Sequence, residues 1–482
     1  MKPLGLGYGI IRQGASNHWY GVRWDSSGAD SACVRTGNSA LYLSQPIQSA
    51  MKRCLLHDNG TVNYYVDADN PHFKDGESTP VASGTTTGTS AGELVDSGAD
   101  FINDGVVEGM VVKNTTDDTF AVIKGVAANT LTIAPDYFVS GEDYEVGTAN
   151  YGGVDGQVMV EVPKFYDRQY HIGVYRYWDI SEYRLSGFTL HPAFMKDGVE
   201  VDYRYHSAFE GSMYDDSVGA MCAKASVTNS IYATGDKFCS VAGQWAKTNE
   251  KWTEYREGSA ARGTGWRDID FTLNSAVQIL YLVEYADFDS QDQIGMGRTE
   301  LSGGGWTADS YIGMTGLSIG DGNGTNSVSV GGSSGYLTDY MTYRGIENWY
   351  GNVWKILEGI TWDGRWTGTE AAQPVYYTNN ADDFICEGST NYVHLCDASY
   401  IGENAGYITD LENTFGFIPQ STGSSSLISD YYWQYSEIDR DYWRLVLFGC
   451  HALFSGAAGG FTLYVSDVWT LDLANVSARL AC

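Results

Sequence analysis

Short apolar runs separated by turn residues recur along this chain, and they constrain its fold more than any other feature. Asn59-Gly60 lies between the runs 51–56 and 61–66. Because Asn and Gly tolerate the positive φ angles of a tight turn, this pattern predicts a β-hairpin. Asp197-Gly198, followed by the run 199–205, predicts a second hairpin. A chain built from such units is expected to be mostly β-sheet.

The composition agrees with a β-rich, loop-rich fold. The 482 residues include 58 Gly, 35 Tyr and 14 Trp, whereas charged residues are only 18%. This profile is not typical of a helical enzyme. A helical pattern is confined mostly to 240–290, where Asp270 or Thr272 can cap a helix with the apolar stripe 276–283. We expect a core helix under a sheet, and the predicted class is α+β, β-rich.

Composition also divides the chain. A Ser/Thr/Gly-rich linker at 83–90 precedes a series of short predicted strands that ends near residue 148. These strands are expected at 101–102, 110–112, 119–123, 130–133 and 144–146. The predicted units are an N-terminal β region at 1–82, an inserted small β-barrel or sandwich module at 83–148, and a C-terminal domain at 149–482. Residues 300–337 predict long surface loops, and residues 370–430 are expected to be irregular.

The charge and the N-terminus exclude several classes of function. A net charge of −31 argues against a nucleic-acid partner, because such a site needs a basic face to replace phosphate counterions. The first nine residues have no apolar core, so we expect no signal peptide, and no apolar stretch approaches the length of a membrane span. The eight cysteines are dispersed without a C-x-x-C pair, which favours buried free thiols over disulfides or a zinc site. No cofactor is expected.

The C-terminal segment differs in composition from the rest of the chain. Residues 444–448 predict a strand, and small residues follow at 449–450 and 455–460. From Leu445 to Cys482 there is no Lys, Glu, Gln or Met, although the rest of the chain uses these residues freely. Upstream, residues 343–355 place large aromatic residues among glycines and hydrogen-bonding side chains, which predicts a buried cluster with satisfied polar groups.

Two blocks carry a resemblance to a known family. Glu-Asn-Trp-Tyr-Gly-Asn-Val-Trp at 347–354, and the terminal pattern from Tyr442-Trp443-Arg444 to Ser477-Ala478-Arg479-Leu480, resemble the C-type-lectin-like fold of phage tail tip proteins. The chain is most similar to the variable proteins of diversity-generating retroelements. Such proteins commonly close on Gly-Ala-Arg-Leu, so Ser477 is a small departure. Five further blocks are similar to this group: 35–38, 46–49, 58–65, 160–166 and 191–194.

The resemblance implies a C-type-lectin-like C-terminal domain, of the type also found in the formylglycine-generating enzyme, with a variable region at about 444–482. In this family, diversification rewrites adenines in codons that cannot encode Lys, Glu, Gln, Met or Trp, which would explain the composition; Trp469 must then be fixed. Arg444, Gly449, Gly459 and Arg479 would be scaffold residues. The exposed ligand-binding positions implied by analogy are His451, Leu453, Phe454, Ala457, Thr462, Tyr464, Ser466, Asp467 and Asp472.

By this resemblance the protein would be a non-enzymatic receptor-binding adhesin at a phage tail tip. Its partners would be a host cell-surface protein or glycan and other phage tail proteins, and we expect a homotrimer because multivalency strengthens weak sites. It would be made in the host cytoplasm without a signal peptide, would not insert into a membrane and would be located in the virion. Two alternatives stay open: a tail-associated glycan-degrading enzyme, or a lectin-like glycan-binding structural tail protein.

Candidate catalytic and metal motifs are weak. Two G-x-S-x-G matches, at 88–92 and 331–335, lie in Gly/Ser/Thr loops without the strand and helix that a nucleophile elbow needs. Residues 321–324 could bind calcium, as lectin-type domains sometimes do, but a glycine-rich turn is the favoured interpretation, because no bidentate Glu lies at loop spacing. The copper site of formylglycine-generating enzymes needs two close cysteines, and the neighbours of Cys450 and Cys482 do not match. Paired carboxylates of a glycosidase stay an alternative in so acidic a chain, but we predict no catalytic or metal site.

Overall fold

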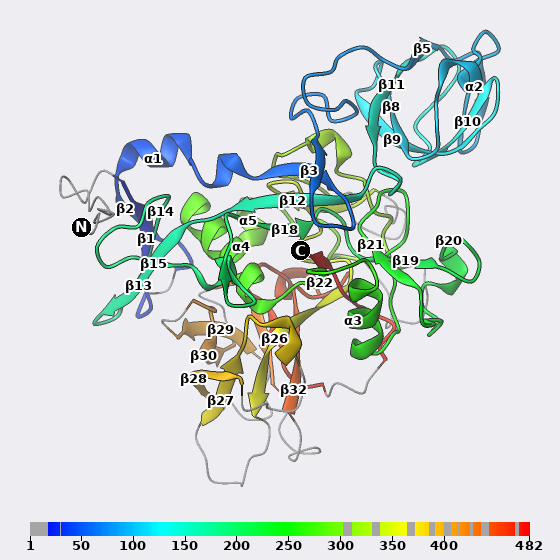
Figure 1. Cartoon of the computed structure of the whole chain (residues 1–482). Helices are drawn as coiled ribbons and strands as arrows, with labels where there is room; N and C mark the ends of the chain where they lie inside the picture. Colours follow the sequence, from blue (N-terminus) through cyan, green and yellow to red (C-terminus); the bar gives the residue numbers. More distant parts are fainter. Residues whose placement is uncertain are drawn as a thin grey trace, which may run out of the picture.

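A computed structural model describes residues 18–28, 30–301, 311–329, 338–363, 372–384, 391–399, 406–412, 415–424, 428–434, 443–467 and 472–482. The chain is 39% strand and 14% helix, which confirms the α+β, β-rich class. The strands of the inserted segment lie at one end of the molecule and the C-terminal sheet lies at the other (Figure 1). Helix α4 lies between them, near the centre.

Helix α4 (Phe271–Tyr285) is the core helix that the sequence predicts. Asp270 caps it, because its side chain accepts a hydrogen bond from the Leu273 amide at 2.8 Å. Every residue of α4 except its last is buried, in keeping with the apolar stripe. A second helix, α3 (Trp252–Ala260), also lies within the range 240–290 that has the helical pattern, and the shorter helices are α1 (Ser39–Ser44), α2 (Phe101–Asp104) and α5 (Ser290–Gln293).

Two antiparallel sheets combine strands from the range 1–82 with strands from the range 149–482. The first has the order β15-β13-β14-β1-β2, with bounds Thr189–Leu190, Tyr166–Ile172, Tyr175–Ser181, Tyr20–Asp25 and Val34–Gly37. The second has the order β22-β35-β18-β12-β3-β4, with bounds Arg267–Asp268, Leu480–Ala481, Tyr203–Ser207, Gln157–Pro163, Lys52–Leu56 and Val62–Tyr65. Strands β3 and β4 are the hairpin predicted around Asn59-Gly60. The second predicted hairpin is also confirmed, since β16 (Met195–Lys196) pairs with β17 (Val199–Glu200).

Strands β5 to β11 form a separate seven-stranded sheet. Their bounds are Ala82–Thr85, Gly88–Ser90, Glu93–Val95, Met110–Asn114, Thr119–Val126, Thr130–Ala134 and Asp143–Asn150, and the sheet order is β5-β11-β8-β9-β10-β7-β6. Its buried residues, among them Leu94, Leu131 and Tyr144, form an apolar cluster of their own. The strand expected at 101–102 is wrong: these residues begin α2, which Asp100 caps and Gly105 ends.

The C-terminal sheet is the largest. Its order is β28-β27-β26-β32-β33-β31-β29-β30, with β34 beside β26. The bounds are Val393–Ser399, Ala372–Tyr377, Trp354–Asp363, Trp443–Phe448, Leu463–Tyr464, Tyr431–Trp433, Gly406–Leu411, Pro419–Gly423 and Val476–Ser477. The expectation of irregular structure at 370–430 is therefore wrong for most of its described residues. These strands pair with partners distant in sequence, which local composition does not reveal.

The remaining described strands form small sheets. They are β19 (Ser212–Asp215), β20 (Ala220–Met221), β21 (Lys237–Cys239), β23 (Asn326–Val328), β24 (Tyr340–Tyr343) and β25 (Ile346–Glu347). Strand β23 and a 3-10 turn at Ile319–Asp321 lie in the region expected to be long surface loops, whereas 302–310 and 330–337 lie outside the described residues.

The buried aromatic and polar cluster predicted at 343–355 is confirmed. Trp349 is 1% exposed, and its ring contacts the rings of Tyr281 and Phe448 at centroid distances of 5.5 and 5.9 Å. Lys355 and Glu210 form a fully buried ion pair at 3.1 Å. Because unpaired buried charges are costly, such pairing lets this polar region lie within the core.

Candidate functional site

The C-terminal segment is anchored by an inner strand and then by a loop that lies tightly against the core. Strand β32 lies between β26 and β33, and Gly449 after it has a φ of 80°, a conformation that favours glycine. A Cβ on Gly460 would lie 2.4 Å from the ring of Trp349. A Cβ on Gly459 would lie 2.0 Å from the Asp430 carboxylate. Glycines therefore fix the path of this loop.

Two arginines hold the ends of the segment. Arg479 is 1% exposed, and its guanidinium donates hydrogen bonds to the carbonyl oxygens of Asn348 at 2.9 Å and Ser207 at 3.2 Å. Arg444 is also buried, and its Nη1 donates to the Ser466 carbonyl oxygen at 2.9 Å. These contacts agree with the scaffold role that the resemblance gives both residues.

The nine predicted ligand-binding positions differ in exposure. Exposed positions are Phe454 and Asp472, and half-buried positions are Leu453, Ala457, Tyr464, Ser466 and Asp467. His451 and Thr462 are buried, so the expectation that these two side chains are exposed is wrong. Trp469, the one Trp of the segment, lies outside the described residues.

His451 and Thr462 are buried because their side chains form hydrogen bonds inside the loop. Nδ1 of His451 accepts a hydrogen bond from the Leu453 amide at 3.2 Å, and burial lowers the pKa of its imidazole to about 3. The ring is therefore neutral at pH 7. The Thr462 hydroxyl donates to the Ala457 carbonyl oxygen at 2.9 Å, across the turn that precedes β33.

Aromatic side chains form a continuous group beside the loop. We call Tyr407, Tyr431, Trp433, Phe454 and Tyr464 the aromatic cluster; Phe454 is exposed and the other four are half-buried. Ring centroids are 5.0 Å apart for Tyr407 and Tyr431, 4.3 Å for Tyr431 and Trp433, and 5.1 Å for Trp433 and Phe454. The buried ring of Trp354 lies 5.5 Å from both Trp433 and Tyr464. Neighbouring strands β29, β31 and β33 and one loop residue thus build this surface.

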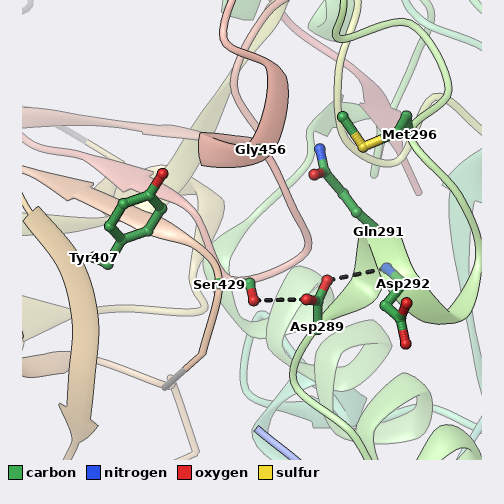
Figure 2. Close-up of a pocket in the computed structure, with 7 residues that line it drawn as sticks. All are labelled: Asp289, Gln291, Asp292, Met296, Tyr407, Ser429 and Gly456. Atoms are coloured by element: carbon green, nitrogen blue, oxygen red, sulfur yellow. Dashed lines mark hydrogen bonds between the residues drawn. The ribbon is translucent and has the colours of Figure 1, made fainter. Parts of the chain in front are cut away.

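A pocket of about 650 Å³ lies where the cluster meets helix α5. It is lined by Asp289, Gln291, Asp292, Met296, Tyr407, Ser429 and Gly456. Figure 2 shows Tyr407 on one side of the pocket and Gln291 with Met296 on the other, while Asp289 and Ser429 lie between them. The Asp289 carboxylate accepts hydrogen bonds from the Ser429 hydroxyl at 2.6 Å and the Asp292 amide at 3.0 Å.

The lining defines what this pocket can bind. It contains two carboxylates, one amide, two hydroxyls and an aromatic ring, and no basic side chain. Such walls can accept hydrogen bonds from hydroxyl or amino groups, and the carboxylates disfavour an anionic ligand. The pocket therefore suits a polar, uncharged or cationic group.

The sequence prediction identified the loop but missed most of the aromatic cluster. Tyr407 and Tyr431 lie within or next to the region expected to be irregular. The run Tyr431-Tyr432-Trp433 has the aromatic composition that strands favour, and it could have been recognised as a strand. Asp289 and Gln291 could not have been found, because only the tertiary structure brings them to Tyr407.

A second pocket, of about 700 Å³, contains a pair of buried carboxyl groups, Asp268 and Glu358. Oδ2 of Asp268 and Oε1 of Glu358 are buried and have no hydrogen-bond partner among the described residues. Burial raises the pKa of Asp268 to about 7 and the pKa of Glu358 well above its ordinary value. Arg256 lies near the pair, with Nε 3.9 Å from the Glu358 carboxylate. Both carboxyls are at most 2% exposed, so their main effect is on the stability of the fold.

Three further features bear on chemistry and location: candidate metal ligands, thiols and apolar helices. Within the described ranges, no group of three or more His, Cys, Asp or Glu side chains is placed to hold a metal ion. The seven described cysteines are free, and five of them, including Cys450 and Cys482, are buried, as predicted; Cys386 lies outside the described residues. Among the helices of the described chain, none has the length and apolar character needed to span a bilayer.

Comparison with known proteins adds no family. No protein-family model matches the chain, and no curated protein shows significant similarity to it.

Proposed function

We propose that this chain is a non-enzymatic receptor-binding protein with a C-type-lectin-like C-terminal domain, diversified by a retroelement and located at a phage tail tip. It would recognise a host cell-surface ligand through its C-terminal segment. The observation that carries the proposal is that the segment contains two kinds of residue. Phe454 and Tyr464 belong to the aromatic cluster, whereas Arg444 and Arg479 are buried.

This combination suits a ligand-binding surface whose side chains change while the scaffold beneath them stays constant. Loops on a rigid scaffold can exchange side chains without losing the core. The glycines that fix the loop against Trp349 and Asp430 provide such a scaffold. Aromatic side chains with adaptable polar neighbours are common recognition residues, since they give a large contact area at a low entropic cost.

The end of the chain supports the lectin-like architecture. Strand β35 at the C-terminus pairs with β18 at His206 and with β22. Strand β12 of the same sheet pairs with β3 of the N-terminal hairpin. The last strand of the C-terminal segment thus belongs to the same sheet as the N-terminal hairpin.

Binding to host cells tests the proposal. Phe454→Ala should reduce cell binding at least about fivefold, because this ring is 36% exposed and offers contact area to a partner. The melting temperature of the variant measures how much its packing against Trp433 contributes to stability. Leu43→Ala is the matched control, since Leu43 is 92% exposed on α1. If Phe454→Ala binds host cells as well as Leu43→Ala does, the C-terminal segment is not the recognition surface.

Two further observations test the expected homotrimer and the expected diversification by a retroelement. Light scattering should give three times the mass of one chain if the protein is a homotrimer. The gene should lie near a reverse-transcriptase gene and a near-copy of its 3′ end, with adenines at the codons for positions such as Phe454 and Tyr464. A monomer would contradict the expected multivalent attachment, and a locus without such a copy would contradict diversification.

A further inference from the structure

We propose that the pocket between Tyr407 and Gln291 is a saccharide-binding subsite that selects neutral or amino sugars over acidic sugars. This inference rests on the proposed function, because it names the chemical class of ligand for the same face of the molecule. It adds residues outside the C-terminal segment, so the subsite would stay constant while the loop beside it varies.

The size of the pocket fits one or two sugar rings. Its volume of about 650 Å³ lies within the range of small-molecule sites, roughly 300–1,000 Å³. A protein partner would instead need a contact of about 800 Å² on each side. Only Gly456 of the C-terminal segment lines the pocket, and this residue has no side chain to fill it.

The polar groups around the pocket include both hydrogen-bond donors and acceptors, as a ligand with several hydroxyl groups requires. The Tyr407 hydroxyl points toward the side of the pocket where Gly456 lies (Figure 2), and it has no hydrogen-bond partner among the described residues. Nε2 of Gln291 donates to the Ser455 carbonyl oxygen at 2.9 Å, which fixes the amide and leaves its oxygen as an acceptor. Asp289 accepts only one described hydrogen bond on each carboxylate oxygen, so each oxygen retains acceptor capacity.

Tyr407 of the aromatic cluster supplies the apolar side of the subsite. Tyr407 lines the pocket, and the rings of Tyr431 and Trp433 continue from it at centroid distances of 5.0 and 4.3 Å. A sugar ring has an apolar C–H face and a polar hydroxyl edge. The first can lie against aromatic rings while the second meets the carboxylate and amide groups.

The charges of the pocket determine which sugars it accepts. Asp289 and Asp292 form no ion pair with a basic side chain in the described parts of the chain, and Asp292 is exposed. A sugar carboxylate or sulfate would meet two unpaired negative charges on a protein whose net charge is −31. A neutral hydroxyl would instead donate to these carboxylates, and an ammonium group would gain attraction.

Binding to an immobilised panel of neutral, amino and acidic oligosaccharides tests this inference. The protein should bind members of the neutral or amino classes and none of the acidic class. Tyr407→Phe removes one hydroxyl and should weaken that binding about five- to tenfold, as loss of one hydrogen bond would. Tyr183→Phe is the matched control, because Tyr183 is 51% exposed and lies outside the pocket. Equal loss in both variants, or none in either, would overturn the assignment.

A charge reversal tests the selectivity. Asp292→Lys places a basic group at the exposed rim, and it should raise binding of acidic oligosaccharides at least about threefold. The same reversal at Asp118, whose side chain is 79% exposed in the turn between β8 and β9, is the control. Unchanged discrimination in Asp292→Lys would show that the carboxylates do not select the ligand.

Treatment of host cells separates this inference from the proposed function. Periodate cleaves the vicinal diols of sugars, whereas protease removes surface proteins. If periodate abolishes binding of the intact protein to cells, the saccharide assignment holds. If only protease abolishes binding, the receptor-binding function stands and the saccharide subsite is wrong. If untreated cells are not bound at all, the proposed function itself fails.

Discussion

At the scale of single residues, the loop after β32 is determined by positions where no side chain fits. Gly459 and Gly460 contact buried groups so closely that a Cβ would overlap with them, whereas a Cβ on Gly456 would have nothing within 4 Å. The resemblance implies a scaffold role for Gly459, but local sequence does not show that Gly460 is also constrained while Gly456 is not. Close approach depends on Asp430 and Trp349, which come from distant parts of the chain.

This difference predicts the effect of adding one methyl group. Gly459→Ala should lower the free energy of unfolding by about 2 kcal/mol, because the methyl group would overlap with the buried Asp430 carboxylate. Gly456→Ala should change it by less than about 0.5 kcal/mol, since this exposed position is open. Denaturant unfolding of both variants measures the difference. Equal stabilities would contradict the close packing of the loop.

At the scale of elements, local chemistry made some predictions reliable. The β3–β4 hairpin and helix α4 were predicted because a turn dipeptide and a capping Asp act within a few residues. Strands β27 to β30 were missed because their pairing is non-local and their sequences are partly polar. Helix α2 was mistaken for a strand because the prediction followed the apolar pair Phe101-Ile102 and not the capping residue Asp100. Tyr407, Tyr431 and Trp433 of the aromatic cluster were missed because they lie on β29 and β31, whose pairing is also non-local.

The cap of α4 also carries an ion pair that the sequence did not show. Asp270 contacts Arg204 at 2.5 Å, and both side chains are fully buried. Asp270→Asn keeps a capping oxygen but leaves the guanidinium without its counter-charge, so we expect a loss of about 3–5 kcal/mol in unfolding free energy. Asp100→Asn on α2 is the matched control, because this cap is exposed and should lose less than about 0.5 kcal/mol. Similar losses in calorimetry would show that the Asp270–Arg204 pair adds nothing beyond the cap.

A pair of carboxyls links α3, β22 and β26 and gives these elements a pH-dependent stability. Asp268 on β22 accepts a hydrogen bond from the Ser259 hydroxyl of α3 at 2.5 Å, and Glu358 on β26 shares its pocket. Burial raises the pKa of both groups, so their protonated forms are favoured in the folded state. Their contribution to stability is complete below the ordinary carboxyl pKa and is lost as the pH rises through the folded values.

Asp268→Asn tests this link, because an amide stays neutral at every pH. The parent protein should lose stability between about pH 4 and pH 7, where the unfolded chain releases the proton that Asp268 retains in the folded state. The variant should show a smaller loss over the same range in denaturant titrations. An identical slope would mean that Asp268 is not protonated in the folded protein.

At the scale of the whole molecule, the net charge and the buried carboxyls act in the same direction. The charge of −31 produces mutual repulsion that grows as carboxylates ionise. Burial raises the pKa of Asp167 and Glu347 to about 7 as well. Both effects predict greater stability at mildly acidic pH than at pH 8, and composition alone could predict only the first of them.

Salt separates these two contributions. Surface repulsion is screened within about 10 Å at 0.1 M salt, whereas buried carboxyls are screened far less. Raising NaCl from roughly 10 mM to 300 mM at pH 8 should therefore raise the melting temperature by at least about 2 °C. At 300 mM the melting temperature should still fall from pH 6 to about pH 7, because the unfolded chain has released protons that the buried carboxyls retain in the folded state. If salt removes the whole pH dependence, only surface charge is responsible, and the raised pKa values of the buried groups do not determine the stability of the fold.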